Sequence, residues 1–369
     1  MGIFLWDTAP SKIFIGSSEV ASVWAWDTKV RPTWYPTESI VYKMNADSSW
    51  NLYVPLSWRK PGWWVGNAYS WKVSVDGWAE TTYSWTWSNG GSITISWYTS
   101  WSEHIITIKP TTETYWWALA YWWTITSGRT YITEILYDGS YMGYATSATD
   151  TWNNFRYQQY NGCTNLKNAA EENIPDTVTT IWNSFRASQY NWCSSLVTIY
   201  DENIGSSVKT IWANFRSNQY ASCTSLQSPA KEWLPNTVTS IWNQFRSNQY
   251  SSCTSLTFAS EEAMPTSITT IWQQFRASQY YWCTALTQIK WWKDLNIGNS
   301  YYRYQQFNST TSNKVVTVMT AVWYAAYDAY VLPNSYVTQV RVPSSYLSSF
   351  KSTWNQPRSS ITDSKFVWY

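Results

Sequence analysis

The sequence has little charge and a single histidine, and both scarcities exclude classes of function. Its 369 residues include 25 Lys and Arg and 23 Asp and Glu, a charged share of 13%, where soluble proteins average roughly 25%. The net charge of +2 indicates no basic patch for nucleic acid or for an anionic membrane surface. With His104 as the only histidine, most histidine-based catalysis and histidine-rich metal sites are excluded.

Long apolar runs are also missing. No stretch of about 18 uncharged apolar residues predicts a membrane-spanning helix. The segment from Met1 to Asp7 has neither a basic start nor an apolar core of the length that a signal peptide requires. We therefore expect neither membrane insertion nor Sec-dependent export of the chain as written.

Motifs that carry chemistry are equally scarce. The sequence has no Cys-x-x-Cys, no Gly-x-Ser-x-Gly, no phosphate-binding glycine loop and no His-Glu-x-x-His. The acidic pairs Glu171-Glu172 and Glu261-Glu262 recur with the repeat described next, which indicates solvation rather than glycoside hydrolysis. We therefore expect a non-enzymatic protein without a metal or cofactor.

An internal repeat decides the predicted architecture. A constant step of 30 residues separates the five cysteines, which are Cys163, Cys193, Cys223, Cys253 and Cys283. The same step relates five Trp from Trp152 to Trp272, five Phe from Phe155 to Phe275, five Tyr from Tyr160 to Tyr280, and five Leu from Leu166 to Leu286. As equivalent positions of stacked units, the cysteines are predicted to be buried, reduced thiols rather than disulfides.

Each unit is predicted to contain a turn at Pro or Gly, a Val-Thr-x-Ile strand, and a polar helical turn through Phe-Arg-x-x-Gln-Tyr. Apolar positions such as Ile181, Phe185 and Tyr190 cannot be buried within 30 residues, so each unit must pack on its neighbours. The predicted fold class is an α+β repeat, a leucine-rich-repeat solenoid, preceded by an all-β, sandwich-like region.

The Cys-x-x-Leu and Ile-Pro-x-x-Val-Thr-x-Ile patterns resemble the BspA-type leucine-rich repeats of bacterial surface proteins. The resemblance covers about residues 145–294, and the unit is longer than the roughly 20 to 29 residues usual for leucine-rich repeats. The segments Val340–Leu347 and Phe350–Ser352 resemble the closing unit of that family. Tyr302–Phe307 repeats the Arg-x-x-Gln-Tyr theme out of phase, as terminal repeats do.

We divide the chain into four parts. Residues 1–36 are predicted to form a β-hairpin anchor, with strands at Lys12–Val20 and Val23–Pro32, and residues 37–140 a β-sandwich-like domain. Residues 141–294 hold the five repeats and residues 295–369 the capping repeats. The Gly16-x-x-Glu19-Val20 segment and the strand after it resemble the N-termini of phage virion and tail-appendage proteins.

Two polar ladders are the candidate ligand-binding residues. Arginine presents a planar fork to carboxylates or phosphates, and neighbouring amides suit a sugar. The candidates are Arg156, Arg186, Arg216, Arg246 and Arg276 with Gln159, Gln189, Gln219, Gln249 and Gln279. A glutamate ladder with the same step (Glu172, Glu202, Glu232 and Glu262) can neutralise the arginines, and this structural alternative is favoured over binding.

Tryptophan is abundant where glycine is expected. The chain has 31 Trp and only 13 Gly, while average glycine usage is about 7%. Many Trp stand where glycine would be expected, after the Ile of each repeat, before Asp7 and Asp27, or beside turns, where a positive φ favours glycine. One hypothesis is that many are native glycines encoded by UGA under a reassigned code. The other is an aromatic ladder that stacks on sugars.

Together these patterns favour an adhesion protein of a phage particle, such as a tail fibre or receptor-binding component, that recognises a host surface glycan or protein. A homo-oligomer or larger virion assembly is expected. A bacterial cell-surface adhesin is the alternative, and a polysaccharide depolymerase comes third.

Overall fold

The computed structural model describes residues 14–15, 18–19, 23–25, 28–30, 39–55, 58–59, 69–85, 92–99, 101–111, 118–119, 128–138, 153–170, 174, 176–201, 204–231, 233–260, 264–291, 306–307, 314–318, 337–342, 344 and 363–368. In these residues β-strands and turns dominate, and the helices are two short 3-10 turns, η1 (Arg129–Tyr131) and η4 (Asp363–Lys365). Within them, no helix has the length and apolar character needed to cross a membrane.

An antiparallel domain precedes the repeats. Its sheet has the order β13-β5-β11-β8-β9, formed by β13 (Ile132–Asp138), β5 (Ile40–Asn45), β11 (Glu103–Pro110), β8 (Tyr69–Val75) and β9 (Thr81–Trp85). Two further ladders pair β6 (Asn51–Pro55) with β10 (Ser92–Ser96), and β7 (Trp58–Arg59) with β12 (Ala118–Leu119). The sequence alternates between apolar and polar residues at 71–75, 92–96 and 104–109, a pattern that predicts strands, and these runs lie within β8, β10 and β11.

The core of this domain follows from strand alternation. Val73 and Val75 of β8 are buried with Ile106 and Ile108 of β11, while the residues between them face outward or are half-buried. Leu52 and Val54 of β6 belong to the same core, which links the two-stranded β6-β10 ladder to the main sheet.

The N-terminal segment differs from its prediction. The sequence predicted one hairpin made of two strands, whereas the structure has two separate antiparallel hairpins. These are β1 (Phe14–Ile15) with β2 (Ser18–Glu19), and β3 (Val23–Ala25) with β4 (Thr28–Val30). The sequence between the paired strands contains Gly16 in one case and Asp27 in the other, and both residue types favour turns.

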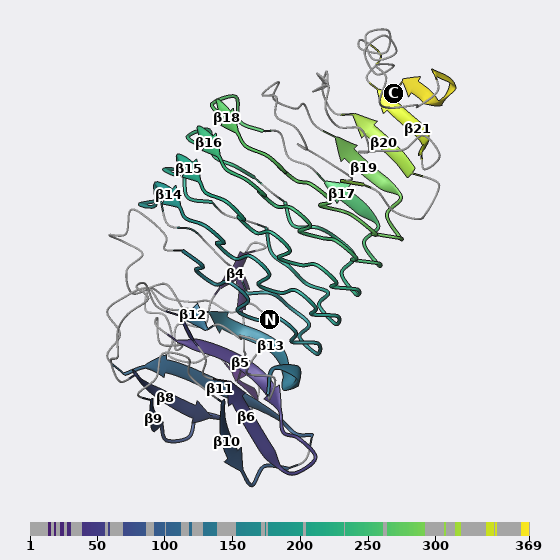
Figure 1. Cartoon of the computed structure of the whole chain (residues 1–369). Helices are drawn as coiled ribbons and strands as arrows, with labels where there is room; N and C mark the ends of the chain where they lie inside the picture. Colours follow the sequence, from purple (N-terminus) through teal and green to yellow (C-terminus); the bar gives the residue numbers. More distant parts are fainter. Residues whose placement is uncertain are drawn as a thin grey trace.

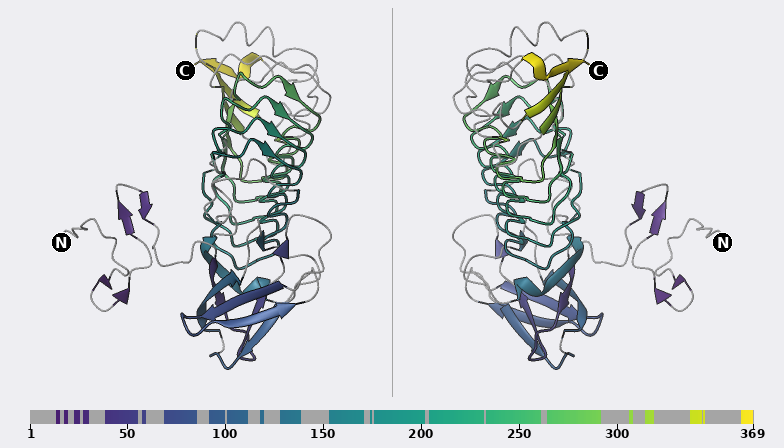
Figure 2. Two further views of the ribbon diagram at one scale, coloured as in Figure 1. Left: turned by 90° about the vertical axis from the view of Figure 1, so that its left-hand side faces the viewer. Right: turned by 90° about the vertical axis from the view of Figure 1, so that its right-hand side faces the viewer.

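Residues 153–291 form what we call the repeat stack. Its short strands β14 (Thr180–Ile181), β15 (Thr210–Ile211), β16 (Ser240–Ile241) and β18 (Thr270–Ile271) pair in parallel, each residue opposite its equivalent 30 positions later. Figure 1 shows these strands at one side of successive coils, and Figure 2 shows the coils piled between the antiparallel domain and the C-terminal strands. The unit of 30 residues is therefore one coil of the stack.

The polar segment of each coil corrects a prediction. We expected a helical turn through Phe-Arg-x-x-Gln-Tyr, but the structure has a run of turns in which alternate residues have positive φ. Gln158 N–H donates to Ala187 O at 3.0 Å, and Tyr160 N–H donates to Gln189 O at 2.8 Å. A helix would direct these bonds along its own segment, whereas this backbone directs alternate N–H groups to the next coil.

Equivalent side chains stack through the interior. Tyrosine rings from Tyr160 to Tyr280 lie 5.3–5.5 Å apart between centroids, and phenylalanine rings from Phe155 to Phe275 lie 5.1–5.8 Å apart. These spacings are close to the distance between paired strands. Tyrosine, cysteine and leucine share one apolar core with the antiparallel domain, while phenylalanine, valine and isoleucine form a second.

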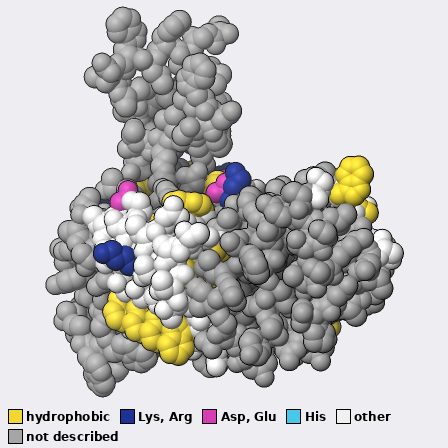
Figure 3. Space-filling view, turned by 90° about the horizontal axis from the view of Figure 1, so that it is seen from above, with side chains coloured by type: hydrophobic (Ala, Val, Ile, Leu, Met, Phe, Trp, Pro, Cys, Tyr) yellow, Lys and Arg dark blue, Asp and Glu magenta, His cyan; other side chains and the backbone are white. Residues whose placement is uncertain are grey.

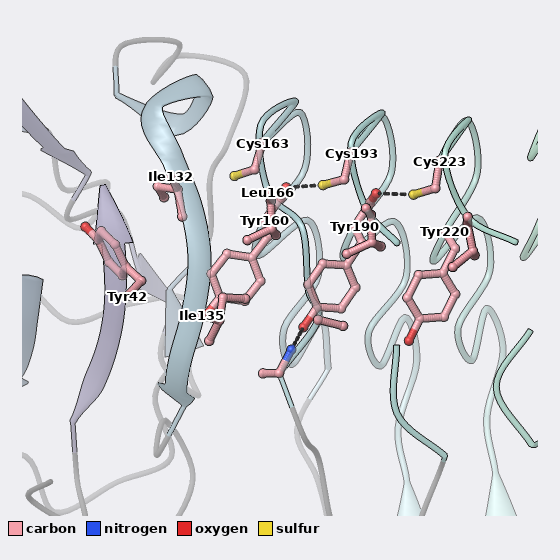
Figure 4. Close-up of a cluster of buried hydrophobic side chains, with 14 of the residues drawn as sticks. Tyr42, Ile132, Ile135, Tyr160, Cys163, Leu166, Tyr190, Cys193, Tyr220 and Cys223 are labelled. Atoms are coloured by element: carbon pink, nitrogen blue, oxygen red, sulfur yellow. Dashed lines mark hydrogen bonds between the residues drawn. The ribbon is translucent and has the colours of Figure 1, made fainter. Parts of the chain in front are cut away.

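Strand β13 closes the first coil. Asn168 uses its side-chain amide as a strand would, accepting from Ile135 N–H at 2.9 Å and donating to Ile135 O at 2.8 Å. Figure 4 shows Ile132 and Ile135 of β13 beside Tyr160, Cys163 and Leu166 of the first coil, with Tyr42 of β5 behind them. The antiparallel domain therefore covers an end that would otherwise be an exposed apolar edge.

At its C-terminal end the stack continues with longer strands. A parallel sheet has the order β17-β19-β20-β21-β22, formed by β17 (Phe258–Ser260), β19 (Gln288–Trp291), β20 (Lys314–Val318), β21 (Val337–Val342) and β22 (Phe366–Trp368). Phe307 stacks on Tyr280 with centroids 5.5 Å apart, and Gln306 donates to Gln279. Tyr302–Phe307 was predicted to repeat the theme out of phase, and Gln306 and Phe307 agree with this at a spacing of 27 residues, while residues 302–305 lie outside the described residues.

The buried carboxylate of Asp138 offers a test of the junction. Asp138 Oδ2 accepts from Tyr160 Oη at 2.8 Å and Gln159 Nε2 at 2.9 Å, and it lies 3.5 Å from an Arg156 nitrogen. We expect Asp138→Asn to lower the free energy of unfolding by about 3 kcal/mol, because it removes the charge beside a buried guanidinium. Urea denaturation followed by fluorescence measures this change. Asp201→Asn, in the exposed pair with Lys231, is the control and should change stability by less than about 0.5 kcal/mol.

The thiols give a second test. All five cysteines are free and buried, and burial raises the pKa of the Cys193 thiol to about 12. Because the thiolate is the reactive form, we expect none of the five to react with a disulfide reagent at pH 8 in the folded protein, and all five to react in denaturant. Rapid reaction of the thiols with the reagent before unfolding would contradict their buried position.

Candidate functional site

The ten predicted ligand-binding side chains lie inside the repeat stack. The five arginines and five glutamines are at most 2% exposed. Each guanidinium carbon lies 4.7–5.5 Å from the ring centroid of the phenylalanine that precedes it. Desolvated cation–π contacts of this kind stabilise a core. Because the arginines stand inside the coils, a surface that meets a partner must be built from other residues.

The glutamines form a continuous chain of amide hydrogen bonds. Each Nε2 donates to the Oε1 of the preceding coil at 3.0–3.3 Å, from Gln306 back to Gln159. The chain ends where Gln159 Nε2 donates to the carboxylate of Asp138. Amide ladders of this kind are typical of stacked, in-register strands. This chain of hydrogen bonds explains why every coil has Gln at the same position, and no ligand is needed for the explanation.

The sequence proposed other positions as well. The glutamates Glu172, Glu202, Glu232 and Glu262, predicted to neutralise the arginines, lie outside the described residues. One position that differs between the otherwise similar units holds Ala187, Ser217, Ser247 and Ala277. Such variation makes it a candidate for ligand specificity, but all four side chains are buried. Of the variable stretches, Val197 and Gln227 are exposed and remain available to a partner.

The structure indicates a different surface at the short strands. Ile181, Ile211, Ile241 and Ile271 point into the core, so the residues before and after each one point outward. We call this row the strand face, and it comprises Thr180, Trp182, Thr210, Trp212, Ser240, Trp242, Thr270 and Trp272. Its residues are half-buried or exposed. Sequence analysis had noted these tryptophans but had not selected them as site residues.

The four indoles of the strand face form a stack. Ring centroids of Trp182, Trp212, Trp242 and Trp272 are separated by 5.1, 4.3 and 4.8 Å along the row, with interplanar angles of 8°, 15° and 8°. Each inner ring face is therefore covered by a neighbour. A sugar ring cannot lie flat on an inner indole, and a partner would meet ring edges and the adjacent hydroxyl groups.

The surroundings of the strand face carry little charge. Thr239 and Thr269 donate their hydroxyls to backbone oxygens of the preceding coil, and Gln244 Nε2 donates to Gln274 Oε1 at 2.8 Å. In Figure 3, which views the molecule of Figure 1 from above, the described residues show few charged side chains and a compact row of hydrophobic ones. Such a surface suits an uncharged polar partner better than an ionic one.

A second constellation lies in the antiparallel domain. His104 Nδ1 is 2.7 Å from Asp76 Oδ2, and His104 Nε2 is 2.6 Å from Ser102 Oγ. Asp76 and Gly77, with φ of 52° and 75°, are the central residues of a turn closed by Trp78 N–H to Val75 O. Asp76 Oδ1 also accepts from Ile105 N–H at 2.8 Å. The three side chains have the order of a Ser-His-Asp triad, which the sequence did not reveal.

One observation favours a structural role for this constellation. The Ser102 hydroxyl lies within hydrogen-bond distance of both Thr99 O and His104 Nε2, and so it can donate to either acceptor. The nearby N–H groups of Tyr98, Trp101 and Ser102 all donate to backbone carbonyls, which leaves none of the three to stabilise an oxyanion. The cluster therefore fastens the turn at Asp76 to β11. Among the described residues, no group of three potential metal ligands clusters either.

This assignment can be tested with an acylating or phosphonylating reagent. We expect a fluorophosphonate probe to leave Ser102 unlabelled, because the nearby N–H groups of Tyr98, Trp101 and Ser102 already donate to backbone carbonyls and do not stabilise the developing anion. Peptide mass spectrometry after incubation measures labelling, and Ser102→Ala provides the blank. Labelling at Ser102 that disappears in Asp76→Asn would contradict the structural assignment and indicate a hydrolase.

Comparisons with known proteins add one neighbour. No protein-family profile matches the sequence, and no curated protein is similar to it. Among solved structures, a leucine-rich repeat protein of T. pallidum (TpLRR) is similar with 16% identity and a TM-score of 0.27, over 60% of this chain and 86% of that chain. The description of this chain as parallel strand repeats rests on its own strand pairing, β14-β15-β16-β18.

Proposed function

We propose that the chain is a non-enzymatic adhesion protein that presents a leucine-rich-repeat solenoid to a host surface glycan. The observation that carries this proposal is the strand face, where coil after coil displays the same hydroxyl and indole at a spacing of 4.3–5.1 Å between rings. A surface that repeats itself suits a partner that repeats itself, such as a polysaccharide.

Rigidity supports the same function. Buried columns of tyrosine, phenylalanine and glutamine fix each coil against the next, so the strand face is formed before a partner arrives. A preorganised surface loses little conformational entropy on binding. The scarcity of charge around it favours hydrogen bonding and apolar contact with sugars over ion pairing.

We propose a location on a phage particle, as part of a tail fibre or receptor-binding component, in a homo-oligomer or a larger assembly. The resemblance of Gly16–Val20 and the following strand to virion proteins supports this location. The BspA-type resemblance of the repeats supports the alternative, a bacterial cell-surface adhesin. Detection of the protein in purified particles, or only in cell envelopes, distinguishes the two.

Binding through the strand face has a direct test. We expect the double variant Trp212→Ala, Trp242→Ala to bind host envelope polysaccharide at least about tenfold more weakly, because aromatic anchors at the centre of an interface contribute most of its energy. Biolayer interferometry on immobilised polysaccharide measures the affinity. Trp192→Ser is the matched control, because Ser222 and Ser252 already occupy the equivalent positions, and it should bind like the parent protein.

Three results would argue against the proposal. Equal affinity for the double variant and the control would exclude the strand face as the binding surface. Absence of binding to any envelope polysaccharide, with binding to an envelope protein, would replace the glycan by a protein receptor. Shortening of the polysaccharide during incubation would identify a depolymerase.

A further inference from the structure

Five tryptophans have a backbone conformation that bulky side chains rarely adopt. Their φ values lie between 60° and 81°, in the left-handed region, where Cβ comes too close to the following carbonyl oxygen and bulky residues are outliers. The five are Trp50 (66°), Trp97 (81°), Trp101 (61°), Trp192 (66°) and Trp282 (60°). Glycine is the residue that adopts this conformation without a steric penalty.

Burial does not compensate for the strain. All five side chains are among the exposed large hydrophobic residues, with exposed fractions from 51% to 89%. The arginines of the stack also have positive φ, but they are buried against phenylalanine rings that hold them in place. Trp282 has a ring contact with Tyr281 at 5.7 Å between centroids, but its side chain is still 51% exposed.

The repeats provide an internal comparison. Trp192 and Trp282 occupy the same position of the coil as Gly162, Ser222 and Ser252, and all five of these residues have φ between 60° and 73°. The backbone at this position is therefore left-handed in every coil. One coil already has glycine there, and two have the small residue serine.

The turns of the antiparallel domain also favour glycine at the positions of Trp50 and Trp101. Asp47 caps the turn before Trp50, accepting from Ser49 N–H and Asn51 N–H, and Trp50 N–H closes that turn on Asp47 O at 3.2 Å. A turn followed by a left-handed residue is a common hairpin connection, with glycine at the left-handed place. Trp101 is the third residue of a turn closed by Ser102 N–H to Thr99 O at 3.0 Å, where a positive φ again calls for glycine.

We infer that positions 50, 97, 101, 192 and 282 carry glycine in the protein as its own cell produces it, and that UGA is the codon read there as glycine. The composition suggested only that many tryptophans are native glycines, whereas a positive φ identifies which ones. It does not extend to the strand face, because Trp182, Trp212, Trp242 and Trp272 have no positive φ and stack on one another. The inference is independent of the proposed function.

Mass spectrometry of the protein from its natural source tests the inference directly. Cleavage after Arg186 and Lys209 releases a peptide, Ala187–Lys209, in which Trp192 is the only tryptophan. We expect this peptide with glycine at position 192, at a mass lower by the difference between the two side chains. Tryptophan at position 192, or any residue other than glycine, would overturn the inference.

Stability of the recombinant protein provides a second readout. We expect Trp192→Gly combined with Trp282→Gly to raise the melting temperature, because the strain disappears and no buried contact is lost. Ser222→Trp, at the equivalent position, is the matched control and should lower it. Gly162→Trp is a poorer control, since a Cβ at Gly162 would lie 2.9 Å from the Arg129 guanidinium. A lower melting temperature for the double glycine variant would overturn the inference.

Discussion

The register between coils is the constraint on which the structure depends. Parallel pairing places every residue beside its equivalent 30 positions later, so a side chain must be able to pack on a copy of itself. Tyrosine and phenylalanine do so through ring stacking, and glutamine does so because one amide has both a donor and an acceptor. Arginine cannot bond to its own copy, and it stacks instead on phenylalanine. The near identity of the units follows from this requirement.

A stack of this kind leaves two open ends, and the chain closes each differently. At the first coil, Asn168 bonds to the backbone of β13, and the Asp138 carboxylate receives the last amide of the glutamine ladder. A negative charge suits that end, because every amide in the ladder directs its N–H toward it. At the other end, Gln306 and Phe307 add one more amide and one more ring, and wider parallel strands follow. The antiparallel domain is therefore a cap for the first coil.

Particular residues show where sequence reasoning succeeded and where it failed. The buried cysteines and the strands at Thr180–Ile181 and its equivalents follow from spacing and alternation, which are local properties. The prediction of a helical turn was wrong. Phe-Arg-x-x-Gln-Tyr has helical spacing, but the N–H groups of this segment donate to the next coil. The polar ladders, for which a structural role was favoured over ligand binding, lie inside the stack for a related reason. Arg216 and Gln219 are polar, and polar residues are expected at a surface, but inside the stack Arg216 packs on Phe215 and Gln219 bonds to the glutamines of both neighbouring coils.

The sequence by itself determined the period of 30 residues, the number of full units and the residues that must stack, because each of these is written in the order of the amino acids. Only the tertiary structure decided which polar ladder is buried, which row of side chains faces outward and which tryptophans have left-handed backbone. Those properties depend on the direction of each Cα–Cβ bond within a coil. That direction is set by hydrogen bonds between coils, which no single unit contains.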